Sequence, residues 1–285
     1  MEIDLRHPEI ADVVRRALAE DIGSGDITTN ATVDADLMAT GRFIARQPMT
    51  VCGVELIELV FGEMGGVDFL GIHIHSGERA AAGDVLATVR GLARTLLTGE
   101  RVALNFMQRL SGIATHTRTH ADAVAGTGCK ILDTRKTTPG LRRLEKWATS
   151  CGGAINHRLG LFDAVLIKNN HITAAGGVRQ ALERVRAAGV PAGVNVEIEV
   201  RTRGELEEAL TFDADHLLLD NLSPDEAAEW IRFIDGRATV ELSGGMRLEK
   251  LREYATTGAN FISVGALTHS AIAVDINFRV SLETA

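Results

Sequence analysis

Residues 194–221 read VNVEIEVRTRGELEEALTFDADHLLLDN. The two ends of this stretch, Val194–Val200 and His216–Asn221, are short runs rich in valine, isoleucine or leucine, as buried strands are. Gly204–Leu210 between them has the apolar spacing of a helix. A strand, a helix and a second strand in so short a stretch indicate a βα unit with two parallel strands.

The same rhythm recurs on both sides of this unit. Further strand-like runs are Cys129–Thr134, Ala164–Lys168, Ala238–Ser243 and Phe261–Leu267. Helix-like segments between them are Val178–Ala188, Pro224–Ile234 and Leu248–Gly258. The repeat predicts a parallel sheet, and the rhythm by itself leaves open a doubly wound sheet or a barrel.

Polar residues at the ends of the predicted strands favour the barrel. The strands carry or are followed by Asp133–Lys136, Lys168, Glu197 with Glu199, Asp220 with Asn221, and Glu241 with Ser243–Gly245. In a (β/α) barrel the active site lies at the carboxyl ends of the strands. Glu197 and Glu199 share one face of their strand, where buried carboxylates need a metal ion or a basic partner.

Two further signals describe the ligand. Ser243–Met246 and Val264–Ala266 bring small residues to the last two strand ends, a common way for barrels to hold a phosphate. Four cations near the predicted mouth, namely Arg135, Lys136, Arg158 and Lys168, call for a small polyanion. Glu197 and Asp220 are oxygen ligands suited to Mg²⁺ carried by a phosphorylated substrate.

The first half of the chain has a different pattern. His7–Glu20 predicts an amphipathic helix, and Asp21–Thr29 predicts a loop rich in glycine, serine and aspartate. Thr40–Val54 and Gly71–Gly91 predict short strands. The spacing of the second segment is faintly similar to that of a biotinyl or lipoyl carrier domain, without the lysine that such a domain modifies. A long helix is expected from Leu92 to Val124, with a break or bend near Gly112.

Composition narrows the class of protein. The 285 residues carry 30 Lys and Arg against 38 Asp and Glu, a net charge of −8, which argues against binding to nucleic acid. Cys52, Cys129 and Cys151 stand far apart and form neither a disulfide framework nor a zinc motif. The apolar runs are too short to span a bilayer, so a cytoplasmic enzyme is expected.

Several motifs together resemble one enzyme family. They are Glu20–Thr29 (EDIGSGDITT), Gly99–Ser111 (GERVALNFMQRLS), Asp133–Arg142 (DTRKTTPGLR), Gly152–Asp163 (GGAINHRLGLFD), Leu166–Ile172 (LIKNNHI), Val196–Val200 (VEIEV), Leu218–Asn221 (LLDN), Ser243–Met246 and Val264–Ser270 (VGALTHS). In this order they are similar to the quinolinate phosphoribosyltransferases, along nearly the whole chain. Ala154, in place of a third glycine, and the run Trp147–Ser150 depart from the family pattern beside the site.

The resemblance implies an α/β architecture of two domains. Residues 1–104 would form an N-terminal α/β sandwich to which the tail 272–285 returns, and residues 105–271 an incomplete, open α/β barrel of about six to seven parallel strands. It also implies a homodimer in which Arg101 is contributed across the interface to the other subunit's site.

The implied reaction converts quinolinate and phosphoribosyl pyrophosphate into nicotinate mononucleotide, CO₂ and pyrophosphate, with Mg²⁺. By resemblance, the quinolinate carboxylates would be held by Arg101, Arg135, His157, Arg158 and Lys168. Phosphoribosyl pyrophosphate would be held by Lys136, Glu197, Asp220, Ser243, Gly244, Gly245, Val264, Gly265 and Ala266. Thr134 would be a further substrate-binding residue. The catalytic set would be Lys168, Glu197 and Asp220, with Glu197 and Asp220 also near the metal, directly or through water.

Two alternatives stay open at this point. Lys168 at a strand end is also typical of the Schiff-base lysine of barrel aldolases, which trapping with borohydride would reveal. The chain could instead be a non-catalytic phosphosugar-binding protein, similar to a paralogous group associated with molybdenum uptake. The cationic set around Arg135, His157 and Lys168 argues against the second alternative, because a dicarboxylate accounts for that many cations.

Overall fold

The computed structural model describes residues 3–191 and 193–282, which fall into two compact units. The first unit contains the chain up to Thr119, Thr137–Gly153 and the chain from Ala266 onward. The second contains His120–Lys136 and Ala154–Gly265. The boundary expected between residues 104 and 105 falls inside a long helix, α4 (Ala93–Ala123).

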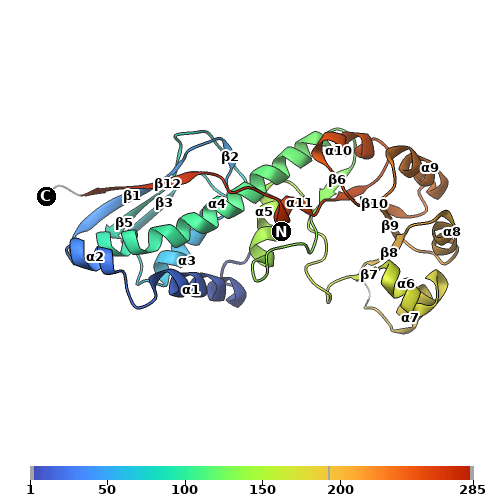
Figure 1. Ribbon diagram of the computed structural model, residues 1–285, viewed down its shortest axis with the longest axis horizontal. Helices are drawn as coiled ribbons and strands as arrows, with labels where there is room; N and C mark the ends of the chain where they lie inside the picture. Colours follow the sequence, from blue (N-terminus) through green and yellow to red (C-terminus); the bar gives the residue numbers. More distant parts are fainter. Residues whose placement is uncertain (1–2, 192, 283–285) are drawn as a thin grey trace. The chain divides into compact units, whose positions relative to one another are not determined.

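The first unit is built on an antiparallel sheet with the strand order β12-β1-β5-β3 (Figure 1). Its strands are β1 (Met38–Ala45), β3 (Phe69–Ile72), β5 (Val85–Leu92) and β12 (Ile276–Leu282), and the short pair β2 (Met49–Thr50) and β4 (Arg79–Ala80) lies apart from it. Alternate residues of β1 are buried. One face of the strand is therefore covered, as its period of two requires.

The first unit also contains several helices. They are α1 (Pro8–Ile22), α2 (Ile27–Thr32), α3 (Leu56–Gly62), α4, α5 (Arg142–Cys151) and α11 (Ala266–His269). Apolar side chains of α1, α3 and α4, such as Val14, Val60 and Leu96, share one buried cluster with Phe43 and Leu86 of the sheet. The aromatic rings of Phe43 on β1 and Phe278 on β12 lie 4.6 Å apart.

Two expectations for the first half were wrong. The chain is helical from Ile27, because Asp26 caps α2 by accepting a hydrogen bond from the Thr29 N–H at 2.9 Å. The long helix does not break at Gly112, since α4 is continuous. A Cβ atom at Gly112 would lie 2.2 Å from the carbonyl oxygen of Ile272, so this glycine permits the close approach of another segment.

The second unit contains a six-stranded sheet in the order β6-β11-β10-β9-β8-β7, in which every neighbouring pair is parallel. The strands are β6 (Lys130–Leu132), β7 (Val165–Ile167), β8 (Val196–Val200), β9 (His216–Asp220), β10 (Thr239–Ser243) and β11 (Phe261–Ser263). The helices are α6 (Asn169–Ala175), α7 (Val178–Ala187), α8 (Arg203–Thr211), α9 (Pro224–Ile234) and α10 (Leu248–Ala255). The predicted α/β class with an open parallel barrel is confirmed.

Local signals explain these elements. Thr202 and Glu205 form a capping box at α8, and Ser223 and Glu226 form another at α9. Helix α9 begins with Pro224, a residue that is favoured at the first helical position. Strands β6 and β7 follow one another in sequence, yet they form the two opposite edges of the described sheet. Within residues 3–191 and 193–282, no helix combines the length and apolar character that a bilayer-spanning segment needs.

Candidate active site

The carboxyl ends of the parallel strands carry one part of the predicted site residues. Thr134, Arg135 and Lys136 come shortly after β6, and Lys168 comes directly after β7, where it precedes α6 with its side chain exposed. Asp220 is the last residue of β9 and Ser243 the last of β10. Lys136 donates its backbone N–H to Oγ1 of Thr134 at 3.0 Å, a bond that shapes the turn after β6.

Asp133 organises the segment that carries two predicted ligands. This carboxylate is fully buried and accepts hydrogen bonds from Nδ2 of Asn156 at 2.6 Å and from the backbone N–H of His157 at 2.8 Å. Ile155 also forms a parallel bridge with Leu132 at the end of β6. Asp133, which was not assigned a role from sequence, therefore anchors His157 and Arg158 beside β6.

Arg135 lies close enough to Arg158 to influence its pKa. Burial lowers the pKa of Arg158, and the positive charge of Arg135 lowers it further, while Asp163 and Glu197 act in the opposite direction. Nη1 of Arg158 donates to the carbonyl oxygen of Ala164 at 3.1 Å. Guanidinium groups near one another suit an anion with several oxygen atoms, such as a carboxylate or a phosphate.

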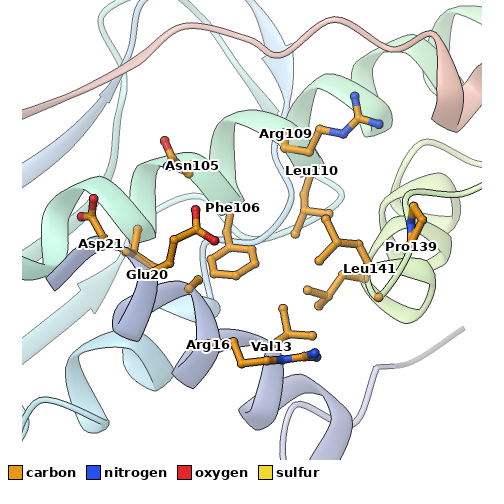
Figure 2. Close-up of a pocket in the computed structure, with 14 residues that line it drawn as sticks. Val13, Arg16, Glu20, Asp21, Asn105, Phe106, Arg109, Leu110, Pro139 and Leu141 are labelled. Atoms are coloured by element: carbon orange, nitrogen blue, oxygen red, sulfur yellow. The ribbon is translucent and has the colours of Figure 1, made fainter. Parts of the chain in front are cut away.

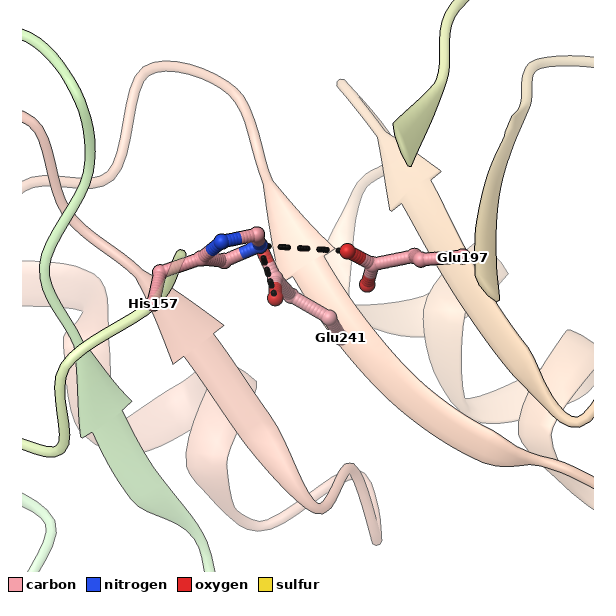
Figure 3. A group of neighbouring side chains, drawn as sticks. All are labelled: His157, Glu197 and Glu241. Atoms are coloured by element: carbon pink, nitrogen blue, oxygen red, sulfur yellow. Dashed lines mark hydrogen bonds and ion pairs between the residues drawn. The ribbon is translucent and has the colours of Figure 1, made fainter. Parts of the chain in front are cut away.

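His157 lies in a buried cluster with Glu197 and Glu241 (Figure 3). Its Nε2 atom is 3.1 Å from Oε2 of Glu197 and 3.5 Å from Oε2 of Glu241. Nδ1 accepts a hydrogen bond from the backbone N–H of Arg158 at 2.7 Å. This contact assigns the proton to Nε2, so both ring nitrogens are engaged by the protein itself.

Glu241 is the most buried carboxylate of this cluster and holds a proton at neutral pH. Burial raises its pKa to about 8, with the negative charge of Glu197 as the second cause. His157 and Ser263 lower the same pKa by smaller amounts. One nitrogen and two carboxylate oxygens within 4.8 Å of one another could also hold a metal ion. Sequence reasoning noted Glu241 only as a strand-end residue and missed this contact.

A cavity of about 230 Å³ opens onto the cluster. The predicted residues His157, Arg158 and Glu197 line it, together with His216, Thr239 and Phe261, which are the first residues of β9, β10 and β11. Asp220 and Ser243 lie at the other end of their strands. The predicted site residues thus divide into a group around this cavity and a group at the carboxyl ends of β7, β9 and β10.

Glu199 rather than Glu197 is the glutamate beside Asp220. Nη2 of Arg201 lies 2.7 Å from Oε1 of Glu199 and 3.5 Å from Oδ2 of Asp220. In the register of β8 and β9, Glu197 pairs with His216, four residues before Asp220. At about 3.3 Å per residue this is roughly 13 Å along the strand.

The sequence suggested that Glu197 and Asp220 would share a magnesium site. The structure does not place these two carboxylates together. Glu199 and Asp220 have the oxygen donors that Mg²⁺ prefers and lie on neighbouring strands, although both also contact Arg201. The sequence placed Glu199 on the same strand face as Glu197, but only Glu197 was assigned to the substrate and the metal. Nothing in the sequence pointed to Arg201.

The small residues after β10 and β11 form tight turns on neighbouring strands. Gly244 has a φ of +96°, and a Cβ atom there would lie 2.2 Å from Oδ1 of Asn221. Asn221 donates its N–H to the Ser243 carbonyl at 2.9 Å, and Val264 donates to that of Leu132 at 3.0 Å. Val264 and Gly265 belong to the second unit, whereas Ala266 begins α11 in the first.

Arg101 belongs to the first unit, where its side chain is exposed on α4. A cavity of about 440 Å³ in that unit is lined by apolar side chains that include Phe106, Leu110 and Leu141 and by polar side chains that include Glu20 and Asp21 (Figure 2). None of the predicted site residues lines this cavity.

Comparison with known proteins agrees with this architecture. Residues 26–111 match the family model of the quinolinate phosphoribosyl transferase N-terminal domain, and residues 113–279 match that of the C-terminal domain. A protein of Mycobacterium leprae named nicotinate-nucleotide pyrophosphorylase [carboxylating] is 45% identical over 271 residues, covering 93% of this chain and 95% of its own. A quinolinate phosphoribosyltransferase [decarboxylating] of Nicotiana tabacum is 39% identical, covering 98% and 85%.

Solved structures show the same likeness. The chain superposes on NadC from Streptococcus pyogenes with a TM-score of 0.94 and 35% identity, covering 99% of this chain and all of the other. It superposes on the nicotinate-nucleotide pyrophosphorylase from Francisella tularensis with a TM-score of 0.92 and 36% identity, covering 98% and 100%. With both family domains present in order, the chain belongs to the quinolinate phosphoribosyl transferase family.

Proposed function

We propose that this chain transfers the phosphoribosyl group of phosphoribosyl pyrophosphate to quinolinate, with loss of CO₂, to form nicotinate mononucleotide and pyrophosphate. It is accordingly a pentosyltransferase of NAD biosynthesis. The observation that carries the proposal is the pair of neighbouring guanidinium groups, Arg135 and Arg158, beside a parallel sheet whose strand ends carry Lys168, Asp220 and small residues. Relatives at 39–45% identity are named for this reaction.

The dicarboxylate would bind at the cationic group. Arg135 and Arg158 are placed to take one carboxylate between them, and Lys168 offers a third cation from the end of β7. His157 supports the same region through Arg158, whose N–H its ring accepts. A small, doubly charged ligand satisfies cations that otherwise repel one another, which explains why a chain of net charge −8 gathers them.

The phosphorylated substrate would bind along the ends of β9, β10 and β11. Ser243–Gly245 and Val264–Gly265 would surround the 5′-phosphate with backbone N–H groups, and Ala266 and Thr134 are further candidates by resemblance. Asp220 and Glu199 would face the ribose hydroxyls, and Lys136 the diphosphate. Mg²⁺ bound to the diphosphate would neutralise charge that develops on the leaving group, with Glu199 and Asp220 as the carboxylates nearest to it.

The chemistry requires positioning more than covalent help from the protein. The ring nitrogen of quinolinate attacks C1 of the ribose as pyrophosphate departs, and holding both reactants in line removes most of the entropic cost. The cations at the site stabilise the departing negative charge. Once the nitrogen is alkylated, the ring is a cationic electron sink, so the neighbouring carboxylate can leave as CO₂.

The proposal also includes a cytoplasmic homodimer whose sites each use Arg101 of the partner subunit. Its support is that Arg101 is exposed and lies in a different unit from the other cations. Mixing two inactive variants, Arg101→Ala and Lys168→Ala, tests it directly. Mixed dimers would contain one site with both native residues, so we expect activity to return on mixing, and none to return if each chain builds its own site.

The decisive assay measures release of pyrophosphate from phosphoribosyl pyrophosphate and Mg²⁺, with quinolinate or nicotinate as acceptor. We expect release that depends on quinolinate and is abolished by Lys168→Ala with the fold retained. Lys250→Ala, which changes an exposed lysine of α10, is the matched control. Equal activity with nicotinate, or full activity of Lys168→Ala, would contradict the assignment. The non-catalytic alternative is not favoured by the named relatives.

A further inference from the structure

Two cysteines far apart in the sequence lie against the same stretch of α4 in the first unit. The backbone N–H of Cys52 donates to Oγ of Ser111 at 2.9 Å, and that hydroxyl donates to the Cys52 carbonyl at 3.0 Å. Arg118, two turns further along α4, donates from Nη2 to the Cys151 carbonyl at 3.2 Å. Both backbones are thus held beside one helix.

The two thiols are in contact and differ in exposure. A side-chain hydrogen bond joins Cys52 and Cys151. Cys52 is fully buried, whereas Cys151, the last residue of α5, is partly exposed. In such a pair, the accessible thiol can be oxidised to a sulfenic acid, and the second thiol can then react with that sulfenic acid to form a disulfide.

The more exposed thiol, Cys151, is also the more acidic of the two. The hydrogen bond from Cys52 lowers the pKa of Cys151, and the positive charge of Arg118 adds to this effect. Burial raises the pKa of Cys52 well above its usual value. Since the thiolate is the nucleophile, Cys151 is the member of the pair expected to react first.

We propose that Cys151 and Cys52 are a modification site at which a hydroperoxide forms a reversible disulfide. The Cys151 thiolate attacks one peroxide oxygen, the O–O bond breaks, and the leaving oxygen takes up a proton, which yields a sulfenic acid and an alcohol or water. The Cys52 sulfur then attacks the Cys151 sulfur, the S–O bond breaks, and hydroxide leaves with the Cys52 proton as water. Two thiols and one hydroperoxide give one disulfide, one alcohol or water, and one further water.

Cys129 provides an internal comparison. It lies in the second unit, is buried, and has a pKa raised to about 11 by burial. Its Sγ atom contacts the Lys130 carbonyl oxygen at 3.8 Å. A thiol of this kind is protonated at neutral pH and shielded from solvent, so it should react slowly.

The test treats the folded full-length protein with hydrogen peroxide, alkylates the remaining thiols in denaturant, and maps peptides without reduction. We expect a Cys52–Cys151 cross-linked peptide that dithiothreitol removes, with Cys129 still alkylated. Loss of Cys151 should be at least tenfold faster than loss of Cys129. Equal rates for the two, or oxidation of Cys151 to sulfinic acid with no cross-link, would overturn the proposal.

Variants separate the two steps. In Cys52→Ser, a sulfenic acid on Cys151 should accumulate and be trapped by dimedone, because the resolving thiol is absent. Cys129→Ser, the matched control, should form the disulfide as the unaltered chain does. The measurement on the unaltered chain decides the proposal even where a variant folds poorly, and none of these outcomes depends on the proposed enzymatic activity.

Discussion

Nε2 of His157 lies 3.1 Å from Oε2 of Glu197, while Nδ1 of the same ring accepts the N–H of Arg158. The imidazole is therefore held from both sides. Glu241, 3.5 Å from the same Nε2, completes the cluster as a protonated carboxyl group. Burial is the main cause of the raised pKa of Glu241, and the nearby Glu197 carboxylate is the second.

The proton on Glu241 makes the stability of the folded chain depend on pH. Glu241 has its pKa raised from 4.5 to about 8 in the folded chain, so between these values the folded chain holds a proton that the unfolded chain has lost. The free energy of unfolding should therefore fall as pH rises through this window, by on the order of 3–5 kcal/mol at about 1.4 kcal/mol per unit. Glu241→Gln should remove that slope in urea unfolding at pH 5 to 8, whereas the exposed Glu249→Gln should retain it.

Glu199 and Glu197 should have different effects when changed. Glu199→Gln removes the negative charge that lies beside Arg201 and Asp220. The KM for phosphoribosyl pyrophosphate should therefore rise about tenfold or more, which corresponds to a loss of about 1.4 kcal/mol of binding free energy. Glu197→Gln should alter the His157 cluster and leave that KM within about twofold. Steady-state kinetics at saturating quinolinate measure both. The reverse pattern would restore Glu197 as the ribose-binding carboxylate.

The ion pair between Arg109 and Glu145 should be a main support of the first unit. Glu145 is fully buried and accepts from Nη2 of Arg109 at 3.0 Å and from the Thr138 N–H and hydroxyl at 3.0 and 2.8 Å. Glu145→Ala leaves a partly buried guanidinium without its anion and the Thr138 donors without their acceptor, and should lower the free energy of unfolding by about 1–3 kcal/mol. Denaturant titration checks this. Glu253→Ala, on the exposed face of α10, should change it by less than about 0.5 kcal/mol.

Gly112→Ala tests the close approach of residues 272 and 273 to α4. The new methyl group would meet the Ile272 carbonyl oxygen at 2.2 Å and Cα of Ala273 at 3.0 Å, so a loss of about 1–3 kcal/mol in unfolding free energy is expected. Gly204→Ala on α8 is the matched change in open space and should be neutral or stabilising by up to about 1 kcal/mol. Similar effects for both variants would mean that the 272–273 segment moves aside without cost.

The sequence by itself determined the class of fold and most of the candidate site. Strands and helices of the second unit follow from apolar periodicity and caps, which act over a few residues, so Val194–Val200 and His216–Asn221 were located to within two residues. Polar groups at strand ends share an edge because parallel strands run in one direction. The resemblance then named the reaction that the relatives' names support.

Only the tertiary structure decided which of these residues are neighbours. The register between β8 and β9 pairs Glu199 with Leu218, two residues before Asp220, and Arg201 contacts both carboxylates. The Asp133 anchor brings His157 to Glu197 and Glu241. The contact of Cys52 with Cys151 likewise joins segments that no local pattern relates. Register and long-range contacts depend on how distant segments pack together, and that information is absent from the short-range spacing that the sequence displays.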